Sequence, residues 1–129
     1  MEKNILVVDD TLMMRKLIKR FLGQFYNVRL EENGLDAFLS MQKGYIPDLI
    51  ISDIQMPKMD GFEFLEQIKS TGFLKDIPVI MLSSIDESKV RVKFLKLGVT
   101  DYLVKPFNPE ELVLKVNNIF ERMNQYVQN

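Results

Sequence analysis

Five short apolar runs, each followed by a stretch with helical spacing, constrain the fold of this chain more than any other feature. They lie at residues 5–8, 26–30, 49–51, 79–82 and 102–104. The first, third and fourth runs lack polar alternation, which is typical of strands covered on both faces. The more mixed run at 26–30 predicts an edge strand. We therefore expect an α/β fold in which five strands form one parallel sheet with helices on both faces, a three-layer arrangement.

The stretches between these runs carry the apolar spacing of helices. In the first and the last stretch, apolar residues recur every three or four positions, at Met14, Leu17, Ile18, Phe21, Leu22 and Phe25, and at Leu112, Val116, Ile119, Phe120 and Met123. This spacing predicts one buried face on each of the two helices. Weaker patterns predict helices at about 35–42, 61–69 and 86–97.

Polar residues at the boundaries predict where helices begin and end. Two pairs have the spacing of capping boxes: Asp60 with Glu63, and Ser84 with Glu87. Asn108 followed by Pro109 predicts the start of the last helix, and Gly98 predicts the end of the helix before it. Asp60 is therefore assigned to capping rather than to chemistry.

Length and charge limit the classes of function. With 129 residues the chain has the size of one domain, which we assign to residues 1–122, followed by a polar C-terminal tail at 123–129. The 17 basic and 18 acidic residues give a net charge of -1, so neither nucleic acid nor a membrane surface is an expected direct partner. The apolar runs are too short to span a bilayer. Because the N-terminus carries no cleavable signal, we expect a cytoplasmic location.

The chain contains neither cysteine nor histidine. Disulfides, thiolate metal sites, His-ligated metals and Ser-His-Asp catalysis are therefore excluded. Any chemistry on a phosphohistidine must use a histidine of a partner.

Reactive side chains follow four of the five predicted strands. Asp9 and Asp10 come after the first strand, Asp53 after the third, Ser83 after the fourth and Lys105 after the fifth. Ligands of parallel α/β sheets bind outside the carboxyl ends of the strands. These side chains are therefore expected to share one small site.

Three crowded carboxylates repel one another, so such a site either protonates some of them or holds a cation. An all-oxygen site suits a hard ion, and Mg²⁺ is expected where a phosphoryl oxygen completes the shell. The Lys105 ammonium can contact a carboxylate before a reaction and a phosphoryl oxygen after it, and the Ser83 hydroxyl can donate to the same group. Taken singly, each residue also fits a cap or a solvated surface position. Their combination favours chemistry.

The chain resembles the receiver domain of two-component response regulators over about residues 3–122, and is similar in size to single-domain chemotaxis-type members. Four motifs carry the resemblance: Val7 to Asp10 (VVDD), Asp53 to Gly61 (DIQMPKMDG), Pro78 to Ser84 (PVIMLSS) and Tyr102 to Phe107 (YLVKPF). The resemblance implies a flavodoxin-like, CheY-like doubly wound (βα)5 fold. It also implies a signalling domain that catalyses only its own phosphotransfer and autodephosphorylation, rather than an enzyme acting on other substrates.

The resemblance further implies a role for each site residue. Asp53 is the nucleophile that takes a phosphoryl group from the phosphohistidine of a sensor histidine kinase or histidine phosphotransfer protein. Mg²⁺ is held by Asp9, Asp10 and Asp53 together with the backbone carbonyl of Gln55. Lys105, in a cis peptide bond with the following proline, contacts the phosphoryl group.

Ser83 and Tyr102 are implied to form the switch of this receiver-like chain. Ser83 follows the phosphoryl group inward, and Tyr102 then turns toward the core. The surface formed by the fifth strand and the helices on either side of it changes, and an unspecified downstream effector binds there. Phosphorylation biases conformations that already exist. The family often has threonine where this chain has Ser83, and serine keeps the hydroxyl.

Three other classes of protein are weighed against this interpretation. A haloacid-dehalogenase-type phosphatase would use Asp9 as its nucleophile, but Thr11 occupies the position at which such enzymes usually carry a second aspartate. A binding module that has lost the chemistry has no need of the complete set of site residues. A nucleotide-binding Rossmann-type protein would carry a glycine-rich loop after the first strand, where this chain has two aspartates.

Overall fold

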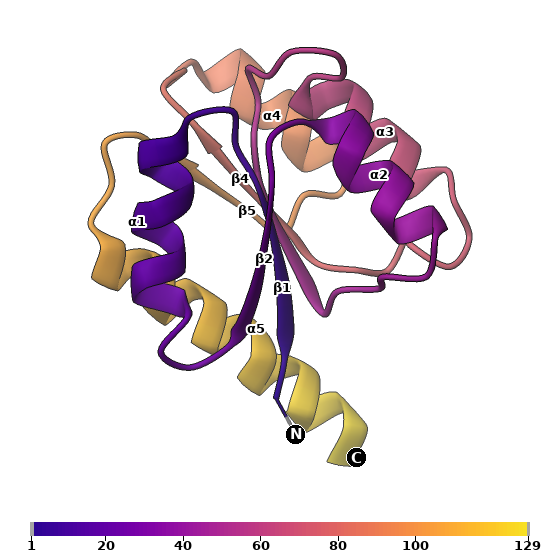
Figure 1. The fold of residues 1–129 in the computed structure, drawn as a ribbon, viewed down its shortest axis with the longest axis vertical. Helices are drawn as coiled ribbons and strands as arrows, with labels where there is room; N and C mark the ends of the chain where they lie inside the picture. Colours follow the sequence, from indigo (N-terminus) through magenta and orange to yellow (C-terminus); the bar gives the residue numbers. More distant parts are fainter. Residues whose placement is uncertain (1, 129) are drawn as a thin grey trace.

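The computed structural model describes the backbone of residues 2–128 and the side chains of residues 2–124. Strands and helices alternate along this part of the chain: β1 (Asn4–Val8), α1 (Leu12–Leu22), β2 (Asn27–Glu31), α2 (Gly34–Gln42), β3 (Leu49–Asp53), α3 (Gly61–Lys69), β4 (Val79–Ser83), α4 (Ser88–Lys96), β5 (Asp101–Val104) and α5 (Pro109–Gln128). All neighbouring strands are parallel, and their order is β2-β1-β3-β4-β5 (Figure 1). The expected α/β fold is confirmed.

Helices cover both faces of the sheet, so the core has two halves. Figure 1 shows α1 and α5 on one side of the strands, and α2, α3 and α4 on the other. Successive residues of β1 alternate between the halves: Ile5 and Val7 belong to the cluster that contains Ile18 of α1, whereas Leu6 and Val8 belong to the cluster that contains Phe64 of α3. A strand that is buried on both faces needs apolar residues at every position. This requirement explains the missing polar alternation.

The central and edge strands differ in burial. Every residue of β3 and β4 is buried, whereas the residues of β2 are exposed or half-buried. The prediction that residues 26–30 form an edge strand is confirmed, because β2 ends the sheet beside β1. The site residues at the ends of β1 and β3 therefore follow strands that lie in the buried centre of the sheet.

Most of the predicted helix boundaries agree with the structure. Asp60 caps α3 by accepting a hydrogen bond from the backbone N–H of Glu63 at 2.9 Å. The Asn108 side chain accepts from the N–H of Glu110 at the start of α5, and Gly98 follows α4 with φ of 91°. Only glycine adopts such a left-handed conformation without strain.

Two local predictions are wrong. Ser84 does not cap a helix, because α4 begins four residues later at Ser88, after Glu87, whose side chain makes no capping hydrogen bond. Ile85 is instead held in a loop by the side chains of Ser83 and Tyr102, and the contact with Tyr102, which spans 17 residues, lies outside the local capping signal. Phe25 lies beyond the end of α1 and is 60% exposed, so it does not extend the buried face of that helix.

The last helix runs further than the sequence pattern indicated. α5 continues to Gln128, through the segment expected to be a separate polar tail; Asn129 lies outside the described residues. The predicted stripe is buried from Leu112 to Phe120, but Met123 is 36% exposed. A division between domain and tail at residue 122 stays a prediction. Among the described residues, no helix has the length and apolar character needed to cross a membrane.

Candidate functional site

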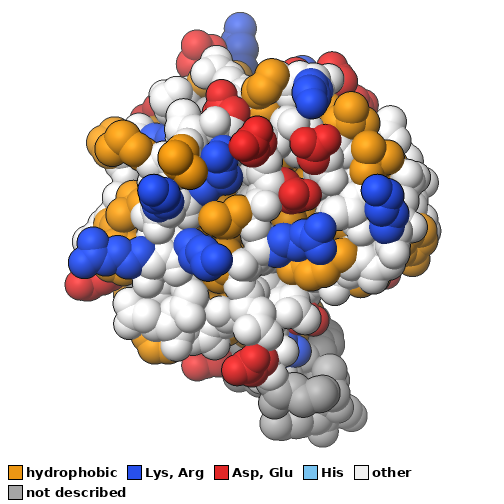
Figure 2. Space-filling model, in the orientation of Figure 1, with side chains coloured by type: hydrophobic (Ala, Val, Ile, Leu, Met, Phe, Trp, Pro, Cys, Tyr) orange, Lys and Arg blue, Asp and Glu red, His pale blue; other side chains and the backbone are white. Residues whose placement is uncertain are grey.

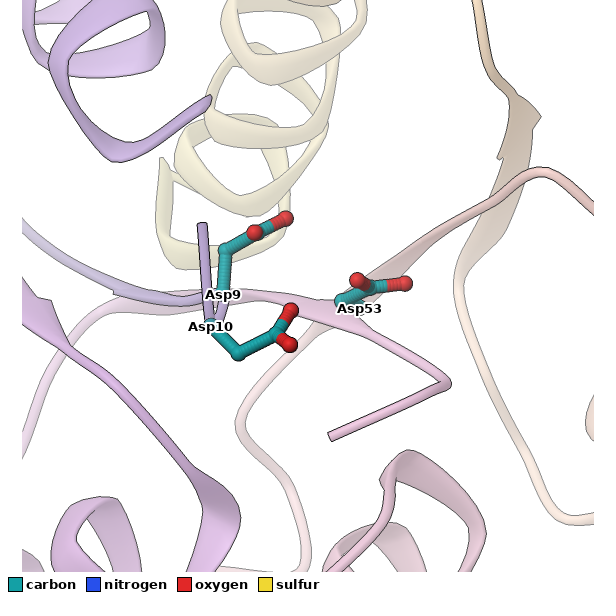
Figure 3. A group of neighbouring side chains, drawn as sticks. All are labelled: Asp9, Asp10 and Asp53. Carbon is teal, nitrogen blue, oxygen red and sulfur yellow. The ribbon is translucent and has the colours of Figure 1, made fainter. Parts of the chain in front are cut away.

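Three aspartates meet where β1 and β3 end. The two strands pair so that Val8 lies opposite Ser52, which makes the next residues, Asp9 and Asp53, neighbours. Each of Asp9, Asp10 and Asp53 offers a carboxylate oxygen within 4.8 Å of the others. Figure 3 shows the three side chains grouped at this rim, with the Asp10 carboxylate directed toward Asp53. The predicted convergence of the acids is therefore present.

The three carboxylates differ in exposure. Asp9 is 1% exposed and Asp53 is 8% exposed, whereas Asp10 is open to solvent. Figure 2 shows acidic side chains, with lysines and arginines among them, in the upper half of the molecule, at the end where the strands of Figure 1 finish. This end of the sheet is accessible to solvent at Asp10.

Lys105 bridges two of the acids. Its Nζ lies 3.0 Å from Asp9 Oδ2 and 3.2 Å from Asp53 Oδ2. The residue follows β5, and its backbone N–H donates to the carbonyl of Ser83 at 2.7 Å, which anchors it to the neighbouring strand. The peptide bond to Pro106 is cis, as the family resemblance implied. Asp9, Asp53 and Lys105 are thus brought together as expected.

The Asp9 carboxylate accepts three hydrogen bonds. Its Oδ1 accepts from both the N–H and the hydroxyl of Thr11, at 2.9 and 2.8 Å, and its Oδ2 accepts from Lys105. Asp53 is held differently, because its Oδ1 accepts from the N–H of Ile54 at 2.7 Å while Oδ2 faces Lys105. Among the described residues, no hydrogen bond reaches the Asp10 carboxylate. Asp10 and Asp53 are therefore the acids with the most capacity for a further ligand.

The electrostatics of the buried pair follow from this arrangement. Burial raises the pKa of the Asp53 carboxyl above its ordinary value, and the charge of Asp9 adds to this effect, while Lys105 opposes it. Burial alone would lower the pKa of Lys105, but its hydrogen bond to Asp9 and the charges of both aspartates outweigh burial and raise it. The ammonium is therefore charged at neutral pH, and ionisation of Asp53 is less favourable than that of a solvent-exposed carboxyl group.

The donor set fits a hard divalent cation. All three candidate ligands are carboxylate oxygens, and the one ammonium that contacts them among the described residues pairs with Asp9 and Asp53 only. A cation such as Mg²⁺ prefers oxygen donors and would relieve the remaining repulsion. Gln55 lies two residues beyond Asp53 with an exposed side chain, and the part assigned to its backbone carbonyl stays a prediction.

The two residues expected to form a switch meet at one peptide segment. Ser83 is 1% exposed, and its Oγ accepts from the N–H of Ile85 at 3.0 Å. The Tyr102 hydroxyl donates to the carbonyl of the same Ile85 at 2.7 Å. The Tyr102 ring also packs near Phe94 of α4, with ring centroids 6.1 Å apart. Ser84, by contrast, is exposed and makes no part of this arrangement.

Sequence reasoning missed Arg15 and underestimated Thr11. Arg15 is buried, and its Nη1 donates to the backbone carbonyl of Asp9 at 2.8 Å. The sequence feature that could have indicated its burial is its spacing on α1, three residues before Ile18 and seven before Leu22, which places it on the buried face of the helix. For Thr11, the signal was an Asp with a hydroxyl residue two positions later, which is the pattern of a side-chain turn.

Comparison with known proteins decides the family. The model of the response regulator receiver domain matches residues 5–117. The chain belongs to this family. The receiver domain is also 42% identical, over its whole length, to a probable transcriptional regulator, ycf29, of Porphyra purpurea, and it spans 62% of the length of that protein.

Solved structures agree with the assignment. The chemotaxis response regulator CheY4 of Vibrio cholerae is 32% identical with a TM-score of 0.84, and the match covers 92% of this receiver domain and 99% of CheY4. A structure described as the Mn²⁺-bound form of the response regulator Rcp1 is 30% identical with a TM-score of 0.78, and the match covers 91% of each chain. The flavodoxin-like fold and the two-component signalling class are therefore shown.

Proposed function

We propose that this receiver domain is a phosphorylatable switch in which Asp53 accepts a phosphoryl group from the phosphohistidine of a sensor histidine kinase or histidine phosphotransfer protein. The observation that carries the proposal is the setting of the Asp53 carboxylate. It stands at the rim of the sheet, with one oxygen held by the N–H of Ile54 and the other facing Lys105, beside two more acids.

The reaction is a displacement at phosphorus. An oxygen of Asp53 forms the new P–O bond while the P–N bond to the partner's imidazole breaks, and the imidazole nitrogen keeps the electron pair and takes a proton from solvent. The N–H of Ile54 orients the carboxylate for attack, and the hydroxyl of Ser83 is available to donate to a phosphoryl oxygen. Phosphoryl transfer depends mainly on such positioning and on charge neutralisation.

Lys105 supplies a positive charge whose partner can change during the reaction. Its pKa is raised, so it stays protonated over the physiological range, and it contacts Asp53 before transfer. After transfer, the same ammonium can pair with a phosphoryl oxygen, because that oxygen extends from the Asp53 carboxylate. The compact ammonium acts as a point charge and needs no fixed orientation.

Mg²⁺ is the cation that best suits this site. Asp9, Asp10, Asp53 and the Gln55 carbonyl would hold it, and when bound it would neutralise charge on the phosphoryl oxygens. The Mn²⁺ in the description of Rcp1 supports a divalent cation in a relative of this domain. Asp10 is the natural point of entry because it is exposed and carries no competing hydrogen bond from the described residues.

Ile85 would connect the phosphorylation site to the rest of the domain, because it bonds both Ser83 and Tyr102. If Ser83 donates its hydroxyl to a phosphoryl oxygen, its contact with Ile85 changes, and Tyr102 is bonded to the same residue. Tyr102 also packs against Phe94 of α4. Phosphorylation would therefore redistribute conformations of the surface formed by α4, β5 and α5, where a downstream effector binds.

This function places the domain in the cytoplasm, with a kinase or phosphotransfer partner and without direct contact to nucleic acid or membrane. Its catalysis is confined to its own phosphorylation and dephosphorylation. The haloacid-dehalogenase alternative is disfavoured, because Asp9 is 1% exposed and accepts three hydrogen bonds from Thr11 and Lys105, whereas Asp53 is 8% exposed.

A small phosphodonor such as acetyl phosphate tests the proposal without a partner. Wild-type protein incubated with the donor and Mg²⁺ is expected to gain one phosphoryl group by intact mass, and the Asp53→Asn variant is expected to gain none. Chelation of the cation should abolish the gain in the wild type. Equal phosphorylation of the two proteins would refute the assignment of Asp53.

A further inference from the structure

Arg15 is a buried cation that the proposed reaction does not use. Its side chain is 10% exposed and comes from the first turn of α1, directly behind the acidic site. Nη1 donates to the carbonyl oxygen of Asp9 at 2.8 Å, while Nη2 lies 3.6 Å from Oε1 of Glu32, whose side chain is 73% exposed. Burial of an arginine is costly unless its hydrogen bonds are formed, so the contact with Asp9 needs an explanation.

We infer that Arg15 is a positioning residue for the ion site: it fixes the peptide group between Asp9 and Asp10 and thereby aims the Asp10 carboxylate at Asp53. The carbonyl that Arg15 contacts belongs to this peptide group, and the group is planar. Its orientation therefore sets the direction in which the Asp10 side chain leaves the backbone. The inference rests on the proposed function, because the aim of Asp10 matters if the site holds a cation.

The other hydrogen bonds of Asp9 in the described part of the chain do not involve the carbonyl of the peptide group between Asp9 and Asp10, so Arg15 is the residue that holds it. Thr11 and Lys105 hold the Asp9 side chain, and the Asp9 N–H donates to the carbonyl of Glu31 at 3.1 Å. These bonds fix Asp9 up to its α-carbon. Beyond it, no described residue bonds the Asp10 side chain, so the peptide group held by Arg15 is the link between the fixed residue and the exposed ligand.

Charge and positioning predict opposite effects on cation binding. Arg15 is a positive charge bonded to the backbone of Asp9, so removing the charge alone would strengthen the binding of a cation. Loss of the hydrogen bond would instead let the peptide group reorient, and the ligand set would lose its preorganisation. The sign of the change in affinity therefore separates the two roles.

The test measures cation binding in the full chain without any phosphodonor. Mg²⁺ affinity is followed by calorimetry and Mn²⁺ affinity by the paramagnetic resonance of the free ion, for wild type, Arg15→Met and Arg15→Lys. Lys16→Met is the matched control, since it removes one charge from an exposed neighbour on the same helix. We expect Kd to rise about tenfold in Arg15→Met, by a smaller factor in Arg15→Lys, and by less than about twofold in Lys16→Met.

A second readout is independent of the ion. The amide of Asp10 belongs to the braced peptide group, so its NMR order parameter should be lower in Arg15→Met than in wild type, and unchanged in Lys16→Met. Unchanged or tighter cation binding in Arg15→Met would overturn the inference. If Arg15→Met fails to fold, Arg15→Lys decides, and wild-type affinity together with a wild-type order parameter at Asp10 would contradict the role. Both readouts stand apart from phosphorylation, so a failure of Asp53 to accept phosphate is recognised separately.

Discussion

Lys105 partly neutralises the charge of the acidic site, so its removal should destabilise the folded state by leaving buried acids without a counter-charge. Replacing it by methionine leaves Asp9 nine-tenths or more buried with only its Thr11 contacts. An unpaired buried charge is destabilising, so we expect Lys105→Met to lower the free energy of unfolding by about 2 kcal/mol. Urea unfolding at pH 7 in the absence of divalent cations measures the change.

Lys115→Met is the matched control for this prediction. Lys115 pairs with Asp101 at 2.9 Å, but both side chains are about one-third exposed. Such a pair contributes about 1 kcal/mol or less. Equal losses in the two variants would mean that burial of Asp9 does not set the energetic cost.

At Asp53, unlike at Lys105, the proposed function opposes stability. Its pKa is raised above the unfolded value of about 3.8, mainly by burial, so the folded state binds the proton more tightly than the unfolded state. The stability of the wild type therefore falls as pH rises through this window, and the loss is complete above the raised pKa. Asp53→Asn removes the ionisation, so at pH 7 without cations we expect its Tm to be higher by about 3 °C.

The pH dependence of this Tm difference tests whether ionisation of the buried Asp53 is its cause. The difference in Tm between Asp53→Asn and wild type should shrink as pH falls from 7 toward 4, because protonation relieves the wild type. Added Mg²⁺ should stabilise the wild type more than the variant. A variant that is less stable than wild type at pH 7, by the same thermal scans, would show that the pair with Lys105 outweighs burial.

At the scale of elements, the start of α3 is held against the site by a close approach of backbones. The N–H of Gly61 donates to the carbonyl of Ile54 at 2.7 Å. A Cβ at position 61 would lie 2.4 Å from the carbonyl oxygen of Asp53 and 2.7 Å from the α-carbon of Ile54. The obstruction is backbone, so it cannot be relieved by a rotamer change.

We therefore expect Gly61→Ala to lower the free energy of unfolding by about 2 kcal/mol, because α3 must shift away from β3. Gly72→Ala is the control, since no atom lies within 4 Å of the position of its Cβ. That substitution should leave stability unchanged or raise it by up to about 1 kcal/mol. Chemical denaturation of both variants gives the comparison, and a stable Gly61→Ala would contradict the close approach.

Helix ends that are set by residues close together in the sequence could be predicted. The pairs Asp60 with Glu63 and Asn108 with Pro109 act within a few residues, and the structure places their caps as expected. The loop before α4 could not be predicted in this way. Ser83 and Tyr102 both bond Ile85, and the contact with Tyr102 spans 17 residues. Arg15 was missed for a different reason: its place on the buried face of α1 indicates burial, but its partner is a backbone carbonyl, which no pattern of side chains reveals.

At the scale of the whole molecule, the order of the strands creates the site. The chain passes from β1 outward to β2 and then returns to form β3 on the other side of β1. The loops after β1 and β3 therefore run to opposite faces and leave a crevice between them, which is where Asp9, Asp10 and Asp53 meet. The sequence predicted a parallel sheet and a rim of reactive residues. The strand order itself depends on long-range pairing that apolar runs do not encode.

The central claim is that this rim makes the side chain at position 53 the phosphoryl acceptor. Protein treated with acetyl phosphate and Mg²⁺ can be reduced with borohydride, which converts an aspartyl phosphate to homoserine, and the modified position can be read by tandem mass spectrometry. We predict homoserine at position 53. Homoserine at position 9 or 10, or phosphate recovered on a serine or threonine with Asp53 unmodified, would contradict the account.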